Sequence, residues 1–178
     1  MLAVAGRWEE AAAGMRDTAN ALQSSSPRLL SHCLFELSYA EMNLGLWQSA
    51  KETSLQSAKL QAIDMFKAVG LARAAYCASR MGELDEARAL VGRAMELREQ
   101  ATLTAIPGFE GIGIDDAFAQ ALAAVGEEES ARAFLRQALA IWRAGADDLT
   151  DPDERAGLLA CPYFRPLLDL AGRLGVSM

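Results

Sequence analysis

The stretch that decides the fold is GELDEARALVGRAMEL, residues 82–97, because its opening six residues have counterparts elsewhere in the chain. A glycine followed five residues later by an alanine occurs in GRWEEA (6–11), GLWQSA (45–50), GELDEA (82–87) and GEEESA (126–131). The four glycines are separated by 39, 37 and 44 residues. A spacing of this size is typical of folds built from stacked repeats.

Each copy of the motif can be understood as a turn between two helices. A glycine is favoured where a helix ends in a left-handed residue. The short, often acidic segment after it suits the positive N-terminal end of the next helix. The alanine then allows that helix to lie close to its neighbour. We therefore predict that each repeat contains two helices joined by a tight turn.

Apolar spacing on both sides of the turns supports helices throughout. The expected first helices cover residues 28–44, 65–81 and 114–125, with small residues seven positions before the turn glycine at Ser38, Ala75 and Ala119. The second helices carry apolar stripes of the i, i+3, i+4, i+7 type. These stripes are Leu84, Ala87, Leu90, Val91, Ala94 and Met95 in one copy, and Ala131, Phe134, Leu135, Ala138, Leu139 and Trp142 in another. The chain is therefore expected to be all-α.

The repeated segments GLWQSA, GELDEARALVGRAMEL and GEEESARAFLRQALAI resemble the tetratricopeptide repeat (TPR) family over residues 1–145. The family's second small position is matched by Ala94 and Ala138, whereas Thr18 and Ser57 occupy it in the earlier copies. No proline closes the repeats, and the periods exceed the usual length of about 34 residues. Such long repeats look more like the helical sensor regions of large bacterial ATP-dependent transcription regulators. The resemblance implies antiparallel helix pairs stacked as a right-handed α-solenoid, with three or four helical hairpins and C-terminal capping helices.

We expect one repeat domain over residues 1–178, with turns near residues 6, 45, 82 and 126. An acidic loop is expected at 146–154 and a C-terminal cap at 155–178. Apolar residues that could seal the last repeat are Leu158, Leu159, Phe164, Leu167, Leu168 and Leu170. Because residues 1–5 leave little room for a helix before Gly6, we expect either the C-terminal part of a longer repeat array or a first helix that serves as an unpartnered cap. An exposed repeat end leaves self-association open.

Composition restricts the classes of partner and location. The formal net charge of -7 argues against direct nucleic-acid binding, which depends on clustered cations. The three cysteines are widely spaced in apolar helical segments, which indicates packed thiols in a reducing compartment. Neither a leader peptide nor a long apolar run is apparent, so we expect a cytoplasmic protein without membrane contact.

Catalysis is not expected from the available side chains. His32 is the only histidine, and it points about 100° away from its helical neighbour Cys33, which makes a nucleophile and base pair awkward. The segment 108–113 (GFEGIG) lacks the Lys and Ser/Thr of a phosphate-binding loop. The sequence therefore predicts no catalytic residues, no metal site and no cofactor.

The resemblance to TPR proteins implies that partners bind on the concave face, along the first helix of each pair. The residues it places there are His32, Phe35, Tyr39, Asn43, Val69, Tyr76, Arg80, Asp116 and Gln120. Tyr39 and Tyr76 are one repeat apart and either contact a partner or fill gaps between repeats. Arg73 is expected at the edge of the groove at best.

The long third period contains the predicted loop 101–113, ATLTAIPGFEGIG. Its apolar residues, Ile106, Phe109 and Ile112, either pack over the concave face or contact a partner. We therefore predict a non-catalytic scaffold in bacterial signalling or transcription regulation that binds a protein or peptide. The alternative is a receptor for a small inducer, with a pocket on the concave face under this loop.

Overall fold

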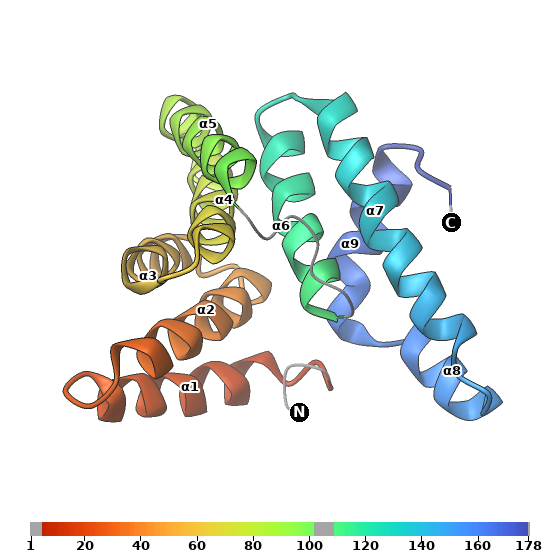
Figure 1. Cartoon of the computed structure of the whole chain (residues 1–178), viewed down its shortest axis with the longest axis horizontal. Helices are drawn as coiled ribbons and strands as arrows, with labels where there is room; N and C mark the ends of the chain where they lie inside the picture. The colour runs from red at the N-terminus through yellow and green to blue at the C-terminus, as the bar shows by residue number, and fades with distance from the viewer. Residues whose placement is uncertain (1–4, 102–108, 178) are drawn as a thin grey trace. The chain divides into compact units, whose positions relative to one another are not determined.

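The computed structural model describes residues 5–101 and 109–177 and is helical, without a strand in those ranges (Figure 1). The helices are α1 (Trp8–Leu22), α2 (Pro27–Asn43), α3 (Trp47–Leu60), α4 (Asp64–Arg80), α5 (Leu84–Gln100), α6 (Phe109–Ala124), α7 (Glu128–Asp147), α8 (Pro152–Leu159), the short 3-10 helix η1 (Pro162–Phe164) and α9 (Arg165–Arg173). The prediction of an all-α fold is confirmed for the described part of the chain.

The chain divides into two compact units, and the prediction of one repeat domain over residues 1–178 stays a prediction. The N-terminal unit contains α1 to α5, and the C-terminal unit contains α6 to α9. In the N-terminal unit each helix packs on the next one along the chain, and α2 also packs on α4. In the C-terminal unit α6 packs on α7, and α8 packs on α7 as well.

The turn glycines adopt the left-handed conformation that the sequence predicted. Their φ angles are +73° at Gly6, +73° at Gly45, +83° at Gly82 and +92° at Gly126. After the last three, the amide of the next residue donates a hydrogen bond to the carbonyl five residues back, over 2.9–3.0 Å. This is the Schellman arrangement, which satisfies carbonyls left open at a helix end. Gly175 after α9 forms a further turn of this kind, which the sequence analysis missed.

Small residues on either side of these turns are buried, as predicted. The alanines five residues after the glycines are Ala11, Ala50, Ala87 and Ala131, and the residues seven before are Ser38, Ala75 and Ala119. The apolar stripe of α7 is buried throughout. In α5 the prediction was wrong for Leu84, which is 44% exposed because it is the first residue of the helix, at the turn.

The helices α3 and α4 of the N-terminal unit approach closely at Gly70. A Cβ atom built on Gly70 would lie 2.9 Å from Ala58 Cβ and 3.0 Å from the Ser54 carbonyl oxygen. The backbones of the two helices therefore approach more closely than a side chain at position 70 would allow.

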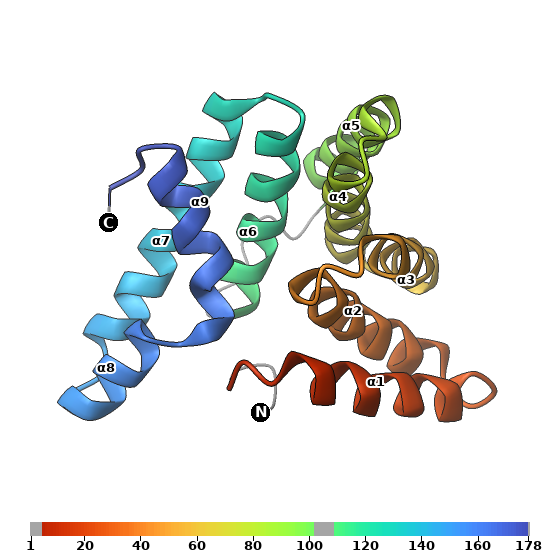
Figure 2. The same cartoon turned by 180° about the vertical axis from the view of Figure 1, so that it is seen from behind.

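In the C-terminal unit α9 packs against both α6 and α7, as Figure 2 shows from behind. Phe118 of α6 stacks on Phe134 of α7 with ring centroids 5.1 Å apart, and Trp142 lies 6.2 Å from Phe164. Burial of Phe164, Leu167 and Leu170 confirms the predicted apolar seal, with Leu158 and Leu168 half-buried. Leu159 is 42% exposed, contrary to expectation, because α8 buries none of its residues.

Two predicted loops are partly helical. The acidic segment 146–154 is split because α7 continues to Asp147 and α8 begins at Pro152, where the Asp151 carboxylate caps the helix by accepting from two backbone amides. The predicted loop 101–113 is also shorter, because α6 begins at Phe109 and includes the buried Ile112. Ile106 and the side chain of Phe109 lie outside the described residues, so their predicted contact with a partner stays a prediction.

Replacing Gly82 with alanine tests the left-handed turn without steric interference, because nothing lies within 4 Å of the added Cβ. Gly82→Ala should lower the free energy of unfolding by about 1–2 kcal/mol, the cost of holding an L-residue in this conformation. Urea unfolding followed by circular dichroism measures the change. Unaltered stability would contradict the assigned role of the turn.

Gly70→Ala tests the close approach of α3 and α4. The overlap with Ala58 and Ser54 should cost about 1–3 kcal/mol in the same measurement. Gly92 is a matched control, since it is exposed within α5 and nothing lies within 4 Å of its added Cβ. Gly92→Ala should raise stability by about 0.5–1 kcal/mol, and the same gain at Gly70 would refute the packing argument.

Candidate binding site

A tryptophan and a tyrosine form the same contact in two successive repeats. Trp8 and Tyr39 meet edge to face with ring centroids 5.7 Å apart, and Trp47 and Tyr76 do so at 5.8 Å. Each tryptophan stands two residues after a turn glycine, and each tyrosine stands six residues before the next turn glycine. The equivalence of the two tyrosines therefore has a structural basis, in which each ring packs on the preceding helix.

The two aromatic pairs differ in what their tyrosines present to solvent. Tyr39 is only 5% exposed and fills space between α1 and α2, whereas Tyr76 is half-buried. Asn43 donates a hydrogen bond to the Tyr39 carbonyl over 2.9 Å. At the equivalent position in the next repeat stands Arg80, and it makes a different contact.

Arg80 is an exposed cation held against the second aromatic pair. Its guanidinium carbon lies 4.3 Å from the centre of the Trp47 ring, and one of its nitrogens donates to the Tyr76 hydroxyl over 2.9 Å. No aspartate or glutamate in the described ranges forms an ion pair with it. We call Trp47, Tyr76 and Arg80 the aromatic–arginine cluster. It combines a positioned donor group with two half-buried rings.

Arg73 differs from the prediction that it lies at the edge of the groove. It is only 1% exposed, and its guanidinium donates to the Phe35 carbonyl and, over 3.3 Å, to the Ser38 hydroxyl. Its guanidinium carbon lies 3.9 Å from the centre of the Phe35 ring and 5.1 Å from that of Tyr39. Because α2 and α4 pack together, this side of α4 faces a helix rather than solvent. The aromatic rings and neutral acceptors stabilise the buried charge there.

The other predicted binding residues are dispersed. His32 is exposed on α2, and Phe35 is half-buried against Phe66. Val69 has no exposed surface. Asp116 and Gln120 belong to the C-terminal unit, where both are buried and joined by a 2.7 Å hydrogen bond.

Beside the buried pair of Asp116 and Gln120, the structure brings two further groups of predicted residues together. One is the exposed pair of Tyr76 and Arg80, to which the sequence analysis did not add Trp47. The other surrounds Arg73 and contains Phe35 and Tyr39. Trp47 is visible in the motif GLWQSA, and its place two residues after the turn glycine is the signal that could have found it.

The three cysteines form no disulfide, and Cys77 is the most deeply buried of them. Burial raises the pKa of the Cys77 thiol to about 12, so it stays protonated and unreactive near neutral pH. Cys33 donates to the Met15 carbonyl over 3.1 Å. In the part of the chain that the structure covers, no group of three or more His, Cys, Asp or Glu side chains could hold a metal ion.

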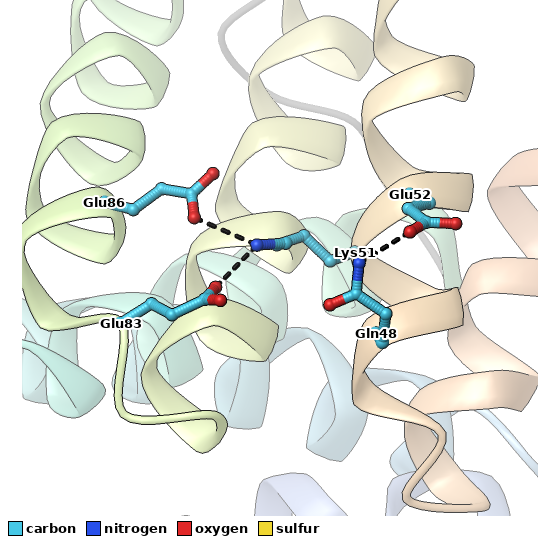
Figure 3. Close-up of polar contacts among 5 residues, drawn as sticks. All are labelled: Gln48, Lys51, Glu52, Glu83 and Glu86. Carbon is cyan, nitrogen blue, oxygen red and sulfur yellow. Dashed lines mark hydrogen bonds and ion pairs between the residues drawn. The ribbon is translucent and has the colours of Figure 1, made fainter.

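Lys51 joins α3 to the beginning of α5 (Figure 3). Most of its side chain is buried, and the ammonium nitrogen lies 2.5 Å from a Glu83 carboxylate oxygen and 2.9 Å from one of Glu86. The hydrogen bond to Glu83 is the main cause that raises the pKa of Lys51, and the same bond lowers the pKa of Glu83.

Lys51 stands six positions after the turn glycine Gly45, and basic residues recur at that position in a pattern that was not predicted from the sequence. Arg88 and Arg132 occupy that position in the later repeats. Arg132 donates to the Leu174 carbonyl over 3.0 Å and pairs with Glu128 and Glu129. Lys51 and Arg132 therefore each reach a neighbouring turn from this position, whereas Arg88 pairs with Asp85 of its own helix.

Lys51→Met should make the stability of the chain less dependent on pH. The lowered pKa of Glu83 means that its stabilising contribution is present above its ordinary pKa of 4.5 and is lost as the pH falls through the lower folded value. The raised pKa of Lys51 means that its contribution is present below 10.5 and is lost at higher pH. The difference in unfolding free energy between wild type and variant should therefore be largest between about pH 4.5 and 10.5.

The control for this prediction is Lys67→Met, which removes an exposed i, i+3 pair with Asp64. Its effect should be small, within about 0.5 kcal/mol, across the titration. Urea unfolding at a series of pH values measures both variants. A difference between wild type and Lys51→Met that does not change with pH would contradict the role of the ion pairs.

Two comparisons with known proteins found no match to this chain. No protein-family model matches the chain, and a search of curated proteins finds no significant match. Within the described ranges, none of the helices has both the length and the apolar character needed to span a membrane.

Proposed function

We propose that the chain is a non-catalytic scaffold of TPR-like helical hairpins, stacked as a right-handed solenoid, that binds a protein or peptide through the aromatic–arginine cluster. The observation that carries this proposal is the exposed guanidinium of Arg80, held against Trp47 and Tyr76 without a carboxylate partner in the described residues. In this proposal the chain serves as a docking part of a cytoplasmic bacterial signalling or transcription regulator.

The chemistry of the cluster supports partner binding. Tryptophan, tyrosine and arginine are the residues most enriched among those that dominate binding energy at protein interfaces. Both rings are half-buried, so they can gain further burial when a partner covers them. Arg80 already has its guanidinium restrained by two contacts, which reduces the side-chain entropy lost on binding.

The charges around the cluster also favour a peptide over nucleic acid. The chain carries 17 basic and 24 acidic residues, and Lys51 is already paired with two glutamates. A phosphate backbone would require several cations that are free to bind it. One restrained arginine beside two aromatic rings is instead suited to a single polar group on a partner with apolar side chains next to it.

Peptides selected against the full chain from a display library test this proposal. Arg80→Met should weaken the binding of the selected peptides by at least about tenfold, because truncating a central interface residue typically costs more than 1 kcal/mol. Fluorescence polarisation with labelled peptides measures affinity. Circular dichroism and the melting temperature should stay close to those of wild type, because Arg80 is exposed.

Arg88→Met is the matched control, since Arg88 is exposed on α5 and pairs with Asp85 of the same helix. It removes the same charge and should leave the affinity within about twofold of wild type. Equal losses in the two variants would show a general charge effect. An affinity unaffected by Arg80→Met would reject the cluster as the binding site.

A further inference from the structure

We infer that the aromatic–arginine cluster recognises the side-chain carboxylate of an aspartate or glutamate in a bound peptide. This inference rests on the proposed function and specifies the chemistry of the partner. Three observations support this inference: hydrogen-bond donors of Arg80 and Tyr76 that a ligand can use, the charges near the cluster, and the contacts that restrain the Arg80 side chain.

The guanidinium of Arg80 retains donors for a ligand. Its guanidinium carbon lies 4.3 Å from the centre of the Trp47 ring, and one nitrogen donates to the Tyr76 hydroxyl. Arginine has five N–H donors in the plane of the guanidinium, so the single hydrogen bond to Tyr76 leaves other donors for a ligand. A carboxylate matches two such parallel donors, which makes this pairing both strong and directional.

Tyr76 supplies a second donor beside them. Its hydroxyl oxygen accepts the hydrogen bond from Arg80, so its own hydrogen is not used in that contact. An acceptor placed next to the guanidinium edge can therefore bond to the phenol as well. Two adjacent donors favour an anionic oxygen group over an amide, because an amide offers one acceptor oxygen and brings an NH₂ group that can only donate.

The charge near the cluster indicates a monoanion. Lys51 stands one helical turn after Trp47 in α3, so Lys51 and Arg80 are both cations of this region. Lys51, however, is already bound to Glu83 and Glu86. Of these two cations, Arg80 is therefore the one left for a ligand, and its single charge balances a carboxylate. A phosphate monoester carries about -1.5 to -2 charges and would remain undercompensated beside these glutamates.

The experiment compares three pools of capped nonapeptides that are degenerate in uncharged residues except at the central position. That position is glutamate in one pool, glutamine in the second and phosphoserine in the third. Binding of each labelled pool to the full chain is measured by fluorescence polarisation at low and high salt. We expect the glutamate pool to bind at least about tenfold more tightly than the glutamine pool, with the difference decreasing as salt is added.

Three variants assign this preference to the cluster. Arg80→Met should abolish the difference between the glutamate and glutamine pools. Tyr76→Phe keeps the ring packed on Trp47 and removes only the hydroxyl, so it should reduce the difference about three- to tenfold. Arg88→Met, which removes an exposed arginine elsewhere, should leave the difference unchanged.

Equal binding of the glutamate and glutamine pools would overturn this inference while supporting a peptide-binding function. The same holds if the preference for glutamate persists in Arg80→Met, or if the phosphoserine pool binds most tightly. If none of the pools binds and library selection also yields no peptide, both the inference and the proposed function fail.

Discussion

The left-handed glycine between two helices is the constraint on which the rest of the structure depends. At Gly45, Gly82 and Gly126 the backbone has a positive φ, and the following amide bonds back to the end of the preceding helix. An L-residue would be strained in that conformation, so glycine allows the chain to reverse within a very short segment. The reversal places the next helix against the last one, where the alanine five residues later is fully or almost fully buried.

Once the turn is set, the number of residues from the glycine determines where each side chain lies. Position two carries Trp8 or Trp47, and its ring meets the tyrosine six residues before the next turn. The two copies differ two residues before that turn. Asn43 bonds to its own helix in the first copy, whereas Arg80 reaches Trp47 and Tyr76 in the second. The exposed cation therefore results from one residue difference within a repeated geometry.

Local features of the fold could be predicted from sequence, and features that depend on helix packing could not. The predicted ranges 28–44 and 65–81 agree with α2 and α4 to within one residue. Both the apolar periodicity of a helix and the glycine that ends it are features of the local sequence. Burial of Arg73 depends on the contact between α2 and α4, which its own helix does not encode. In the candidate site, Tyr76 and Arg80 are one turn apart on the same helix, so their proximity could be predicted from the sequence. Trp47 comes from the preceding helix, so only the repeat register could have indicated it.

In the N-terminal unit, some charged side chains hold helices together, whereas Arg80 faces solvent. Glu41 is 1% exposed and accepts from Arg16 and Ser49, which links α2 to both α1 and α3. Lys51 links α3 to the start of α5. A buried charge that loses its partner is strongly destabilising, so a shifted stacking of these helices would be penalised at each link. Arg80 does not bridge two helices through an ion pair, and its restraint by neutral rings preserves its charge for a contact outside the fold.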